Sequence, residues 1–348
     1  MTGPASGPPV DGDRRIYHGT GRILDPTERD RRWPDPPHWR AFGGGPDEPD
    51  PAPDDAELER RLGRPVLSDH ADPDEVDAVN AALRLRRPLL VTGRPGSGRS
   101  SLAYRIAREL RLGRVLRWPV TTHDTVRAGL YDYDPVGRVR AAARTDDADP
   151  AGDSGIGDHV SLGPLGTALL PYRLPRVLLI DELDQSDIDL PQQLRTVFDD
   201  GGFDIPQLLR TARHAPEVTV HTADPGGTAT VREGRVRCHA FPLVVMTCAE
   251  DRVFPPAFLR HCLRLRIQEP DREAVLRVID AHFPDGVAGS TTVVEAFLAR
   301  RGRPDAPTLD QLLDAVHLLR TCPVNDLPKD WDQLLRTLLR GVPAAEPR

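Results

Sequence analysis

The residues best suited to chemistry lie in the glycine-rich stretch 93–100, which joins two apolar segments. Its sequence, GRPGSGRS, has the spacing G-x-x-x-x-G-[K/R]-S, in which glycines let consecutive backbone N–H groups turn around a phosphate. Arg99 stands where this motif has lysine, and the hydroxyl of Ser100 is placed to bind Mg²⁺. The residues predicted to contact phosphate are Gly93, Arg94, Pro95, Gly96, Ser97, Gly98, Arg99, Ser100 and Ser101.

Two carboxylates form a second signal, because Asp181 and Glu182 directly follow the apolar run 177–180. A continuous apolar run is typical of a buried parallel strand, and such sheets bind ligands at the carboxyl ends of their strands. We expect Asp181 to hold the water shell of Mg²⁺, and Glu182 to orient and polarise the attacking water. The two signals together predict a site for ATP and Mg²⁺.

The elements that must position these residues alternate between strand and helix, which indicates an α/β fold. A strand at 88–91 precedes the glycine-rich stretch, and an amphipathic helix at 102–112 follows it. Alternating apolar and polar residues predict a hairpin within 217–241, and the acidic segment 146–158 is expected to be a mobile loop. Further strands are expected at 114–120, 177–181, 243–247 and, at an edge, 263–267, with helices at 55–64, 74–85 and 190–199.

The two ends of the chain differ from this core in composition. Residues 1–57 are rich in proline and glycine, so we expect a largely disordered extension before a nucleotide-binding core at 58–269. Trp33 and Trp39 indicate that part of the extension docks, either as a strap on the chain's own core or as an arm for a partner. Residues 270–348 are expected to form a helical domain with a short disordered tail. Its predicted helices are 272–282, 291–300, 308–319 and 331–339.

Composition narrows the classes of function. The net charge is −7, which disfavours nucleic acid as the main partner, and Lys329 is the only lysine in an arginine-rich chain. The four cysteines form no C-x-x-C pair and are expected to be reduced and mostly buried. Because there is no apolar run of membrane-spanning length and no signal peptide, we expect a cytoplasmic protein.

From about residue 73 to residue 342 the sequence resembles the MoxR-like AAA+ ATPases, a family of P-loop NTPases. The resemblance implies a parallel five-stranded sheet, a helical lid, ATP bound between them, and a ring, typically a hexamer. It rests on the order and spacing of seven blocks. They are GRPGSGRS at 93–100, THDTVRAGLYDYDPVGRV at 122–139, GPLGTALL at 163–170, VLLIDELDQSDIDLPQQL at 177–194, FDDGGFDIP at 198–206, VVMTCAEDRVFPPAFLRHCLRLRI at 244–267 and RPDAPTLDQLLDAV at 303–316.

The resemblance also implies roles for arginines outside the two motifs. Arg260, or alternatively Arg264, falls at the arginine finger that reaches the γ-phosphate bound by a neighbouring subunit. Arg303, or alternatively Arg301, is the nearest match to the sensor-2 arginine of the lid.

The sequence departs from the family at two positions. Arg99 replaces the lysine of the P-loop, and the exchange is not neutral because a guanidinium is planar and bulkier than an ammonium. At sensor 1 the family has Asn, whereas Cys248 and Ala249 stand here, so Thr247 is the remaining polar residue for the γ-phosphate or the water.

Three functions are therefore weighed. The first is an ATP hydrolase with slow turnover that remodels or activates a client protein. The second is a nucleotide-binding switch or scaffold with little turnover, suggested by Arg99 and the altered sensor 1. A nucleic-acid motor is the least favoured, because the net charge is −7 and no basic-aromatic patch is found.

Overall fold

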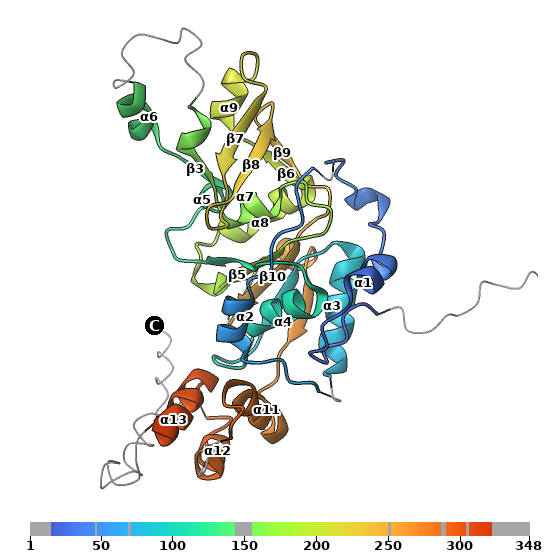
Figure 1. Cartoon of the computed structure of the whole chain (residues 1–348), viewed down its shortest axis with the longest axis vertical. Helices are drawn as coiled ribbons and strands as arrows, with labels where there is room; N and C mark the ends of the chain where they lie inside the picture. The colour runs from blue at the N-terminus through green and yellow to red at the C-terminus, as the bar shows by residue number, and fades with distance from the viewer. Residues whose placement is uncertain are drawn as a thin grey trace, which may run out of the picture.

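The molecule consists of three parts that follow one another along its long axis (Figure 1). A layered α/β unit lies in the middle, a second sheet lies at one end, and a bundle of helices lies at the other. The computed structural model describes residues 15–45, 47–68, 71–142, 155–249, 252–286, 290–303 and 306–321. Most of the loop expected at 146–158 and the whole helix expected at 331–339 lie outside these residues.

The middle unit is built on a five-stranded sheet in which every neighbouring pair of strands is parallel. The strands are β1 (Leu89–Thr92), β2 (Leu116–Pro119), β5 (Val177–Asp181), β10 (Leu243–Cys248) and β11 (Leu263–Arg266). Their order is β11-β1-β10-β5-β2, so β11 is an edge strand as its alternating sequence predicted. This parallel order, with a glycine-rich loop after β1, is that of an AAA+ P-loop α/β core and confirms the predicted fold class.

Helices cover both faces of this sheet, because successive residues of a strand point to opposite sides. In β5, Val177 and Leu179 pack into the cluster that includes α2, α3 and α4, whereas Leu178 and Ile180 pack into the cluster that includes α5, α7, α8 and α10. The helices are α2 (Asp55–Leu62), α3 (Pro73–Leu85), α4 (Ser101–Leu110), α5 (Val126–Leu130), α7 (Pro164–Ala168), α8 (Leu190–Asp200) and α10 (Pro256–Leu259).

The second sheet has six strands in the order β3-β4-β7-β8-β9-β6. The predicted hairpin is confirmed as three antiparallel strands, β7, β8 and β9. The other three strands were not expected, because three residues are too few to show an alternating pattern. The strands are β3 (Tyr131–Tyr133), β4 (Val160–Leu162), β6 (Gly202–Asp204), β7 (Glu217–His221), β8 (Thr228–Arg232) and β9 (Arg235–Arg237). Short helices accompany them at α6 (Pro135–Ala142), η2 (Gly157–His159) and α9 (Pro206–Thr211).

Residues 15–45, called here the N-terminal strap, pack against the middle unit. Of the two dockings considered for the segment around Trp33 and Trp39, the one seen here is the strap on the chain's own core. Ile16 and Tyr17 are buried, and their N–H groups donate to Oδ1 of Asn80 in α3 at 2.9 and 3.3 Å. The strap contains only α1 (Pro26–Arg32) and the single turn η1 (His38–Arg40).

Side chains of the core replace the regular pairing that the strap lacks. The Glu109 carboxylate, near the end of α4, accepts N–H groups of His18, Gly19 and Gly21 at 2.5, 3.2 and 3.3 Å. Because these donors are satisfied by a side chain, the strap can be held in place without helix or strand. Of the two tryptophans, Trp33 lies under the Arg86 guanidinium and Trp39 is 67% exposed.

The helical bundle, which we call the lid, contains α11 (Arg272–His282), α12 (Ser290–Leu298) and α13 (Leu309–Thr321). These bounds agree with the three predicted helices within two residues. The helices share a core of their own, which includes Val275, Val293 and Leu312. No described helix in any part of the molecule is long and apolar enough to cross a membrane.

Replacing Glu109 by Gln tests how the strap is attached. A glutamine presents one amide N–H₂ group where the carboxylate accepts backbone N–H groups, so at least one strap donor loses its acceptor. We expect a loss of about 1–3 kcal/mol in the free energy of unfolding and faster proteolysis of the strap. Urea denaturation and limited proteolysis measure both effects. Glu59→Gln, on the exposed face of α2, is the matched control, and equal behaviour of the two variants would contradict this attachment.

Candidate functional site

The glycine-rich loop connects the end of β1 to the start of α4, at the carboxyl edge of the parallel sheet. Gly96 and Gly98 have φ values of +75° and +90°, which L-residues with a side chain rarely adopt. A Cβ built on Gly98 would meet no atom of the described chain within 4 Å, so its open side is free for a ligand. The loop therefore has the backbone that a phosphate cradle requires.

Two buried polar atoms of this loop have no hydrogen-bond partner within the described part of the chain. They are Nη1 of Arg99 and Oγ of Ser97. A buried guanidinium donor without an acceptor is costly, and an anion such as phosphate would satisfy it. The donors present in this loop are thus of the kind that a nucleotide phosphate requires.

Asp181 is the meeting point of the site. It ends β5, and its Oδ1 accepts the hydroxyl groups of Ser100 at 2.6 Å and Thr247 at 2.7 Å. Burial raises the pKa of Asp181, but the hydrogen bonds from Ser100, Thr247 and Arg117 outweigh it and the net pKa is below the usual value. The carboxylate is therefore ionised at neutral pH and, with the Ser100 hydroxyl, offers the oxygen ligands that Mg²⁺ prefers.

Arg117 was not predicted as a site residue. It comes from β2, the strand paired with β5, and its Nη2 and Nε donate to Oδ2 of Asp181 at 2.8 and 3.1 Å. The alternation of β2 leaves Arg117 outside the core while its neighbours Leu116 and Trp118 are buried. That alternation was the only sequence signal, and an arginine on an exposed strand face is not by itself informative.

Glu182 directly follows the strand and has an exposed side chain. Its backbone is left-handed, with φ +61° and ψ +48°, just before the turn η3 (Leu183–Gln185). Its N–H donates to Oγ1 of Thr247 at 2.9 Å. A non-glycine residue held in this conformation costs about 1–3 kcal/mol, and such residues cluster at functional sites.

Thr247 lies in β10 and is only 1% exposed. Its hydroxyl donates to Asp181 and accepts from the N–H of Glu182, so it links the two acidic residues. Thr247 therefore positions the two acidic residues. Both hydrogen bonds of its hydroxyl are made within the protein. Two residues further along, the N–H of Ala249 donates to Oδ1 of Asp184 at 3.0 Å.

The two arginines predicted for the finger lie away from the glycine-rich loop of their own chain. Both are exposed, Arg260 just before β11 and Arg264 within it, paired with Leu90. In a parallel sheet the start of β11 lies beside the start of β1, at the edge opposite the loop. Arg260 therefore does not lie at the glycine-rich loop of its own chain.

The lid contacts the loop through residues other than the predicted guanidinium groups. Arg94 of the loop forms an ion pair with Glu269 at 3.1 Å and donates to the carbonyl oxygen of Arg303. Glu269 also holds Arg301, whose Nη2 donates to the Glu269 carbonyl oxygen at 2.8 Å. The side chain of Arg303 is exposed. The two sensor-2 candidates are thus near the loop, but one is held by Glu269 and the other contributes its backbone.

Thr308 is a contact that the sequence reading missed. It caps α13, and a Cβ built on Gly96 would lie 2.7 Å from Thr308 Cα. Thr308 and Gln311 form a reciprocal cap, in which the Thr308 N–H donates to Oε1 of Gln311 at 2.8 Å. The T-x-x-Q spacing is a capping-box signal for the helix start, which was predicted at residue 308, but it carries no information on the contact with Gly96.

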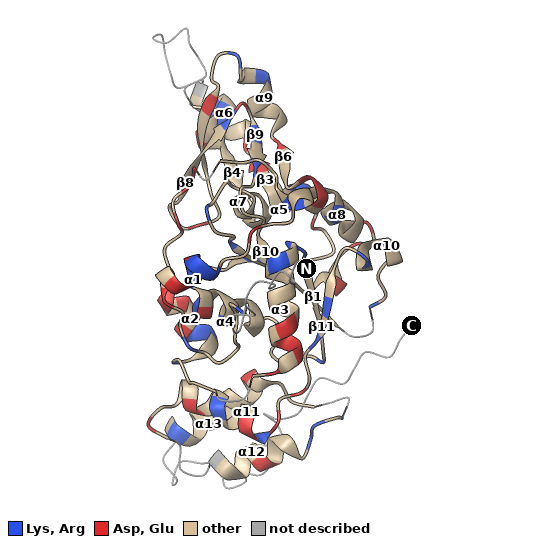
Figure 2. Cartoon of the chain, turned by 90° about the vertical axis from the view of Figure 1, so that its right-hand side faces the viewer, with Lys and Arg blue, Asp and Glu red and all other residues tan. Residues whose placement is uncertain are grey.

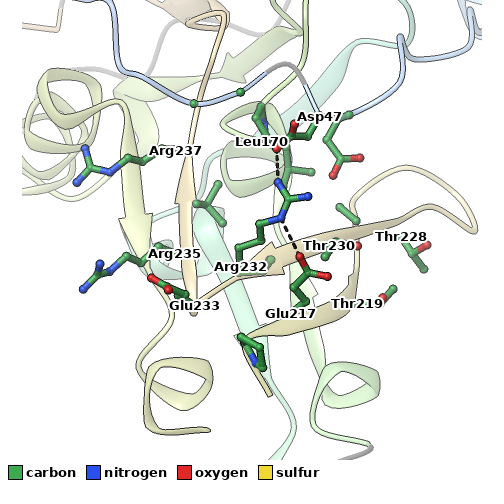
Figure 3. Close-up of a pocket in the computed structure, with 18 residues that line it drawn as sticks. Asp47, Leu170, Glu217, Thr219, Thr228, Thr230, Arg232, Glu233, Arg235 and Arg237 are labelled. Carbon is green, nitrogen blue, oxygen red and sulfur yellow. Dashed lines mark hydrogen bonds and ion pairs between the residues drawn. The ribbon is translucent and has the colours of Figure 1, made fainter. Parts of the chain in front are cut away.

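A separate hollow of about 820 Å³ lies on the second sheet (Figure 3). It is lined by part of the segment 44–48 and by the face of β7, β8 and β9, and none of its lining residues belongs to the glycine-rich loop. Arg232 reaches across it to Glu217 and to Asp47.

Comparison with known proteins finds similarity to solved structures and to nothing else. No protein-family model and no curated protein matches the chain. A similar structure is the RuvB Holliday junction branch migration motor of Thermotoga maritima, 13% identical over 83% of this chain and 72% of that chain, with a TM-score of 0.37. Another is the AAA domain of FIGL-1 in complex with ADP, 14% identical over 74% and 68%, with a TM-score of 0.34. The fold assignment rests on the strand order of this chain and not on these likenesses.

Thr247→Val tests the link between the two acidic residues. The substitution keeps the shape of the side chain but leaves the Glu182 N–H and one bond to Asp181 unmade, in a buried position. We expect a loss of about 1–3 kcal/mol in the free energy of unfolding, measured in urea. Thr219→Val, on the exposed side of β7, is the control and should change stability little. A similar loss for both substitutions would mean that the Thr247 hydroxyl contributes nothing specific.

Proposed function

We propose that this chain is an AAA+ ATPase of the MoxR-like type, which binds ATP and Mg²⁺ between the middle unit and the lid. One observation carries the proposal: Nη1 of Arg99 is buried without a partner in the described structure, and the next residue, Ser100, is bonded to Asp181. A phosphate-binding group and an oxygen-ligand pair for Mg²⁺ thus lie side by side. Hydrolysis of the γ-phosphate is the reaction that this arrangement serves.

Each residue has a distinct part in that reaction. The loop N–H groups and Arg99 hold the phosphates, and Ser100 with Asp181 holds the metal ion, which neutralises phosphate charge when bound. Glu182 orients the attacking water and accepts its proton. Thr247 fixes the spacing of Asp181 and Glu182 through the two hydrogen bonds of its hydroxyl.

We infer that the active form is a ring, typically a hexamer, that acts on a client protein. Arg260 supports this inference, because it is exposed at the edge opposite the loop of its own chain, as expected of a residue that serves the site of another subunit. A nucleic-acid partner is disfavoured, since basic and acidic segments are interspersed over the face in Figure 2 and form no single basic stripe.

A second candidate is a nucleotide-binding switch or scaffold with little turnover. The observation that favours it is that Ala249 has no polar side chain, while the hydroxyl of Thr247 already bonds to Asp181 and to the N–H of Glu182. Among the described residues 247–249, no polar side chain is then left to contact the γ-phosphate or the water. ATP would still bind in this case, because the loop and Asp181 do not depend on sensor 1.

Replacing Glu182 by Gln separates hydrolysis from binding. The amide keeps the size of the side chain but cannot accept a proton, so we expect turnover to fall by roughly 10²–10⁴-fold while nucleotide affinity is retained. Steady-state phosphate release and binding of a fluorescent ATP analogue measure the two quantities. Glu233→Gln is a close control, because Glu233 is also a glutamate with positive φ, at +50°, in the distant second sheet. Undiminished turnover of Glu182→Gln would remove Glu182 from the chemistry, and no turnover in the unsubstituted protein would favour the switch.

Replacing Arg99 by Lys tests whether the loop is fitted to a guanidinium. The lysine keeps the charge but loses the planar fork, and the buried position of Nη1 is left unfilled. We expect turnover to fall about tenfold with a smaller loss of affinity. Arg108→Lys is the control, because Arg108 lies in the helix α4 that follows the loop and is bonded to the Gly63 carbonyl oxygen. Faster turnover in Arg99→Lys would show instead that the site has drifted from an efficient lysine-based enzyme.

A further inference from the structure

The carboxylate of Asp181 already holds a cation from its own chain. Its Oδ1 accepts two hydroxyl groups, and its Oδ2 accepts both Nη2 and Nε of Arg117 at 2.8 and 3.1 Å. Both oxygens that a metal ion would use, directly or through water, therefore have partners in the nucleotide-free protein. A guanidinium with two N–H groups on one carboxylate is among the stronger charge-assisted pairs.

Mg²⁺ and this guanidinium compete for the same group. Mg²⁺ demands near-octahedral oxygen coordination and carries two positive charges, so a fixed guanidinium on Asp181 opposes it by charge as well as by occupying Oδ2. Binding of the ion at Ser100 and Asp181 is favourable only to the extent that it exceeds the loss of the pair with Arg117.

Arg117 is in a position from which it can be displaced. It lies on β2, an edge strand of the sheet, and its side chain is 40% exposed. Asp181 is the only hydrogen-bond acceptor that the described structure gives this side chain. Solvent can therefore take over its donors once the metal ion holds the carboxylate.

We propose that Arg117 is a positioning residue that holds Asp181 in the nucleotide-free protein and is displaced when Mg²⁺ enters. It sets the Mg²⁺ concentration at which the metal-bound nucleotide complex forms. The proposal rests on the proposed function, because it needs a nucleotide at the loop. It concerns metal binding and is independent of whether hydrolysis is fast or slow.

The test is a Mg²⁺ titration of the full chain with a fluorescent ADP analogue, which avoids turnover. For Arg117→Gln we expect the Mg²⁺ concentration at half-saturation to fall about three- to fivefold, the size of effect that a partly exposed ion pair supports. Arg117→Lys keeps one charge without the fork and should lie between the two. Arg173→Gln is the matched control, since its side chain is 45% exposed and paired with Asp30 and Asp50 away from the loop.

The outcomes separate this inference from the proposed function. If the unsubstituted protein binds the analogue but its half-saturating Mg²⁺ concentration is unchanged in Arg117→Gln and Arg117→Lys, the displacement is overturned and the site stands. Weaker binding of the analogue in Arg117→Gln without Mg²⁺, at an unchanged Mg²⁺ midpoint, would also overturn it by assigning Arg117 to the phosphates. If the unsubstituted protein binds no analogue with or without Mg²⁺, the proposed function fails and the inference fails with it. Should Arg117→Gln not fold, the midpoint of Arg117→Lys decides alone.

Discussion

The burial of one carboxylate, that of Asp181, sets the arrangement of the whole site. A carboxylate that is 5% exposed is costly unless every oxygen has donors. Its donors come from three different segments: Ser100 after the loop, Thr247 in β10 and Arg117 in β2. The hydrogen bonds to this one carboxylate therefore fix the positions of the loop, β2 and β10 relative to β5. The geometry that would bind a metal ion is the same geometry that makes the fold tolerate the charge.

The strands and helices whose apolar side chains are buried in a regular pattern could be predicted from the sequence. β5 and β10 are buried along their whole length, and their continuous apolar runs indicate parallel strands. The helix α3 buries Val76, Val79, Ala82 and Leu83 on one face, as its spacing predicted. The strands β3, β4 and β6 could not be predicted in this way, because each has three residues and exists through its pairing with a neighbour. Docking of the strap was expected from its tryptophans, but the contacts that hold it were not, since Glu109 and Asn80 bind its backbone from far along the chain.

In the candidate site, likewise, residues defined by local sequence could be predicted, whereas residues defined by distant contacts could not. Gly98, Arg99 and Ser100 were identified because one short motif fixes their geometry, and Asp181 because it ends an apolar strand. Arg117 and Thr308 were not, since their roles come from contacts across 64 residues to Asp181 and across the domain boundary to Gly96. No local pattern distinguishes an arginine on an exposed strand face from one that binds a buried carboxylate. Strand pairing alone supplies that information.

The loop also faces two parts of the molecule at once, which ties the lid to the site. Arg94 pairs with Glu269, just before the lid, and Gly96 contacts Thr308 of the lid, whereas Ser100, only a few residues away, is bonded to Asp181. Because the loop is short and its glycines set its path, a shift on one side changes the contacts on the other. A ligand biases the lid only by the difference in free energy of these contacts between two arrangements. The ion pair of Arg94 with Glu269 and the packing of Thr308 on Gly96 are the contacts in which that difference would lie.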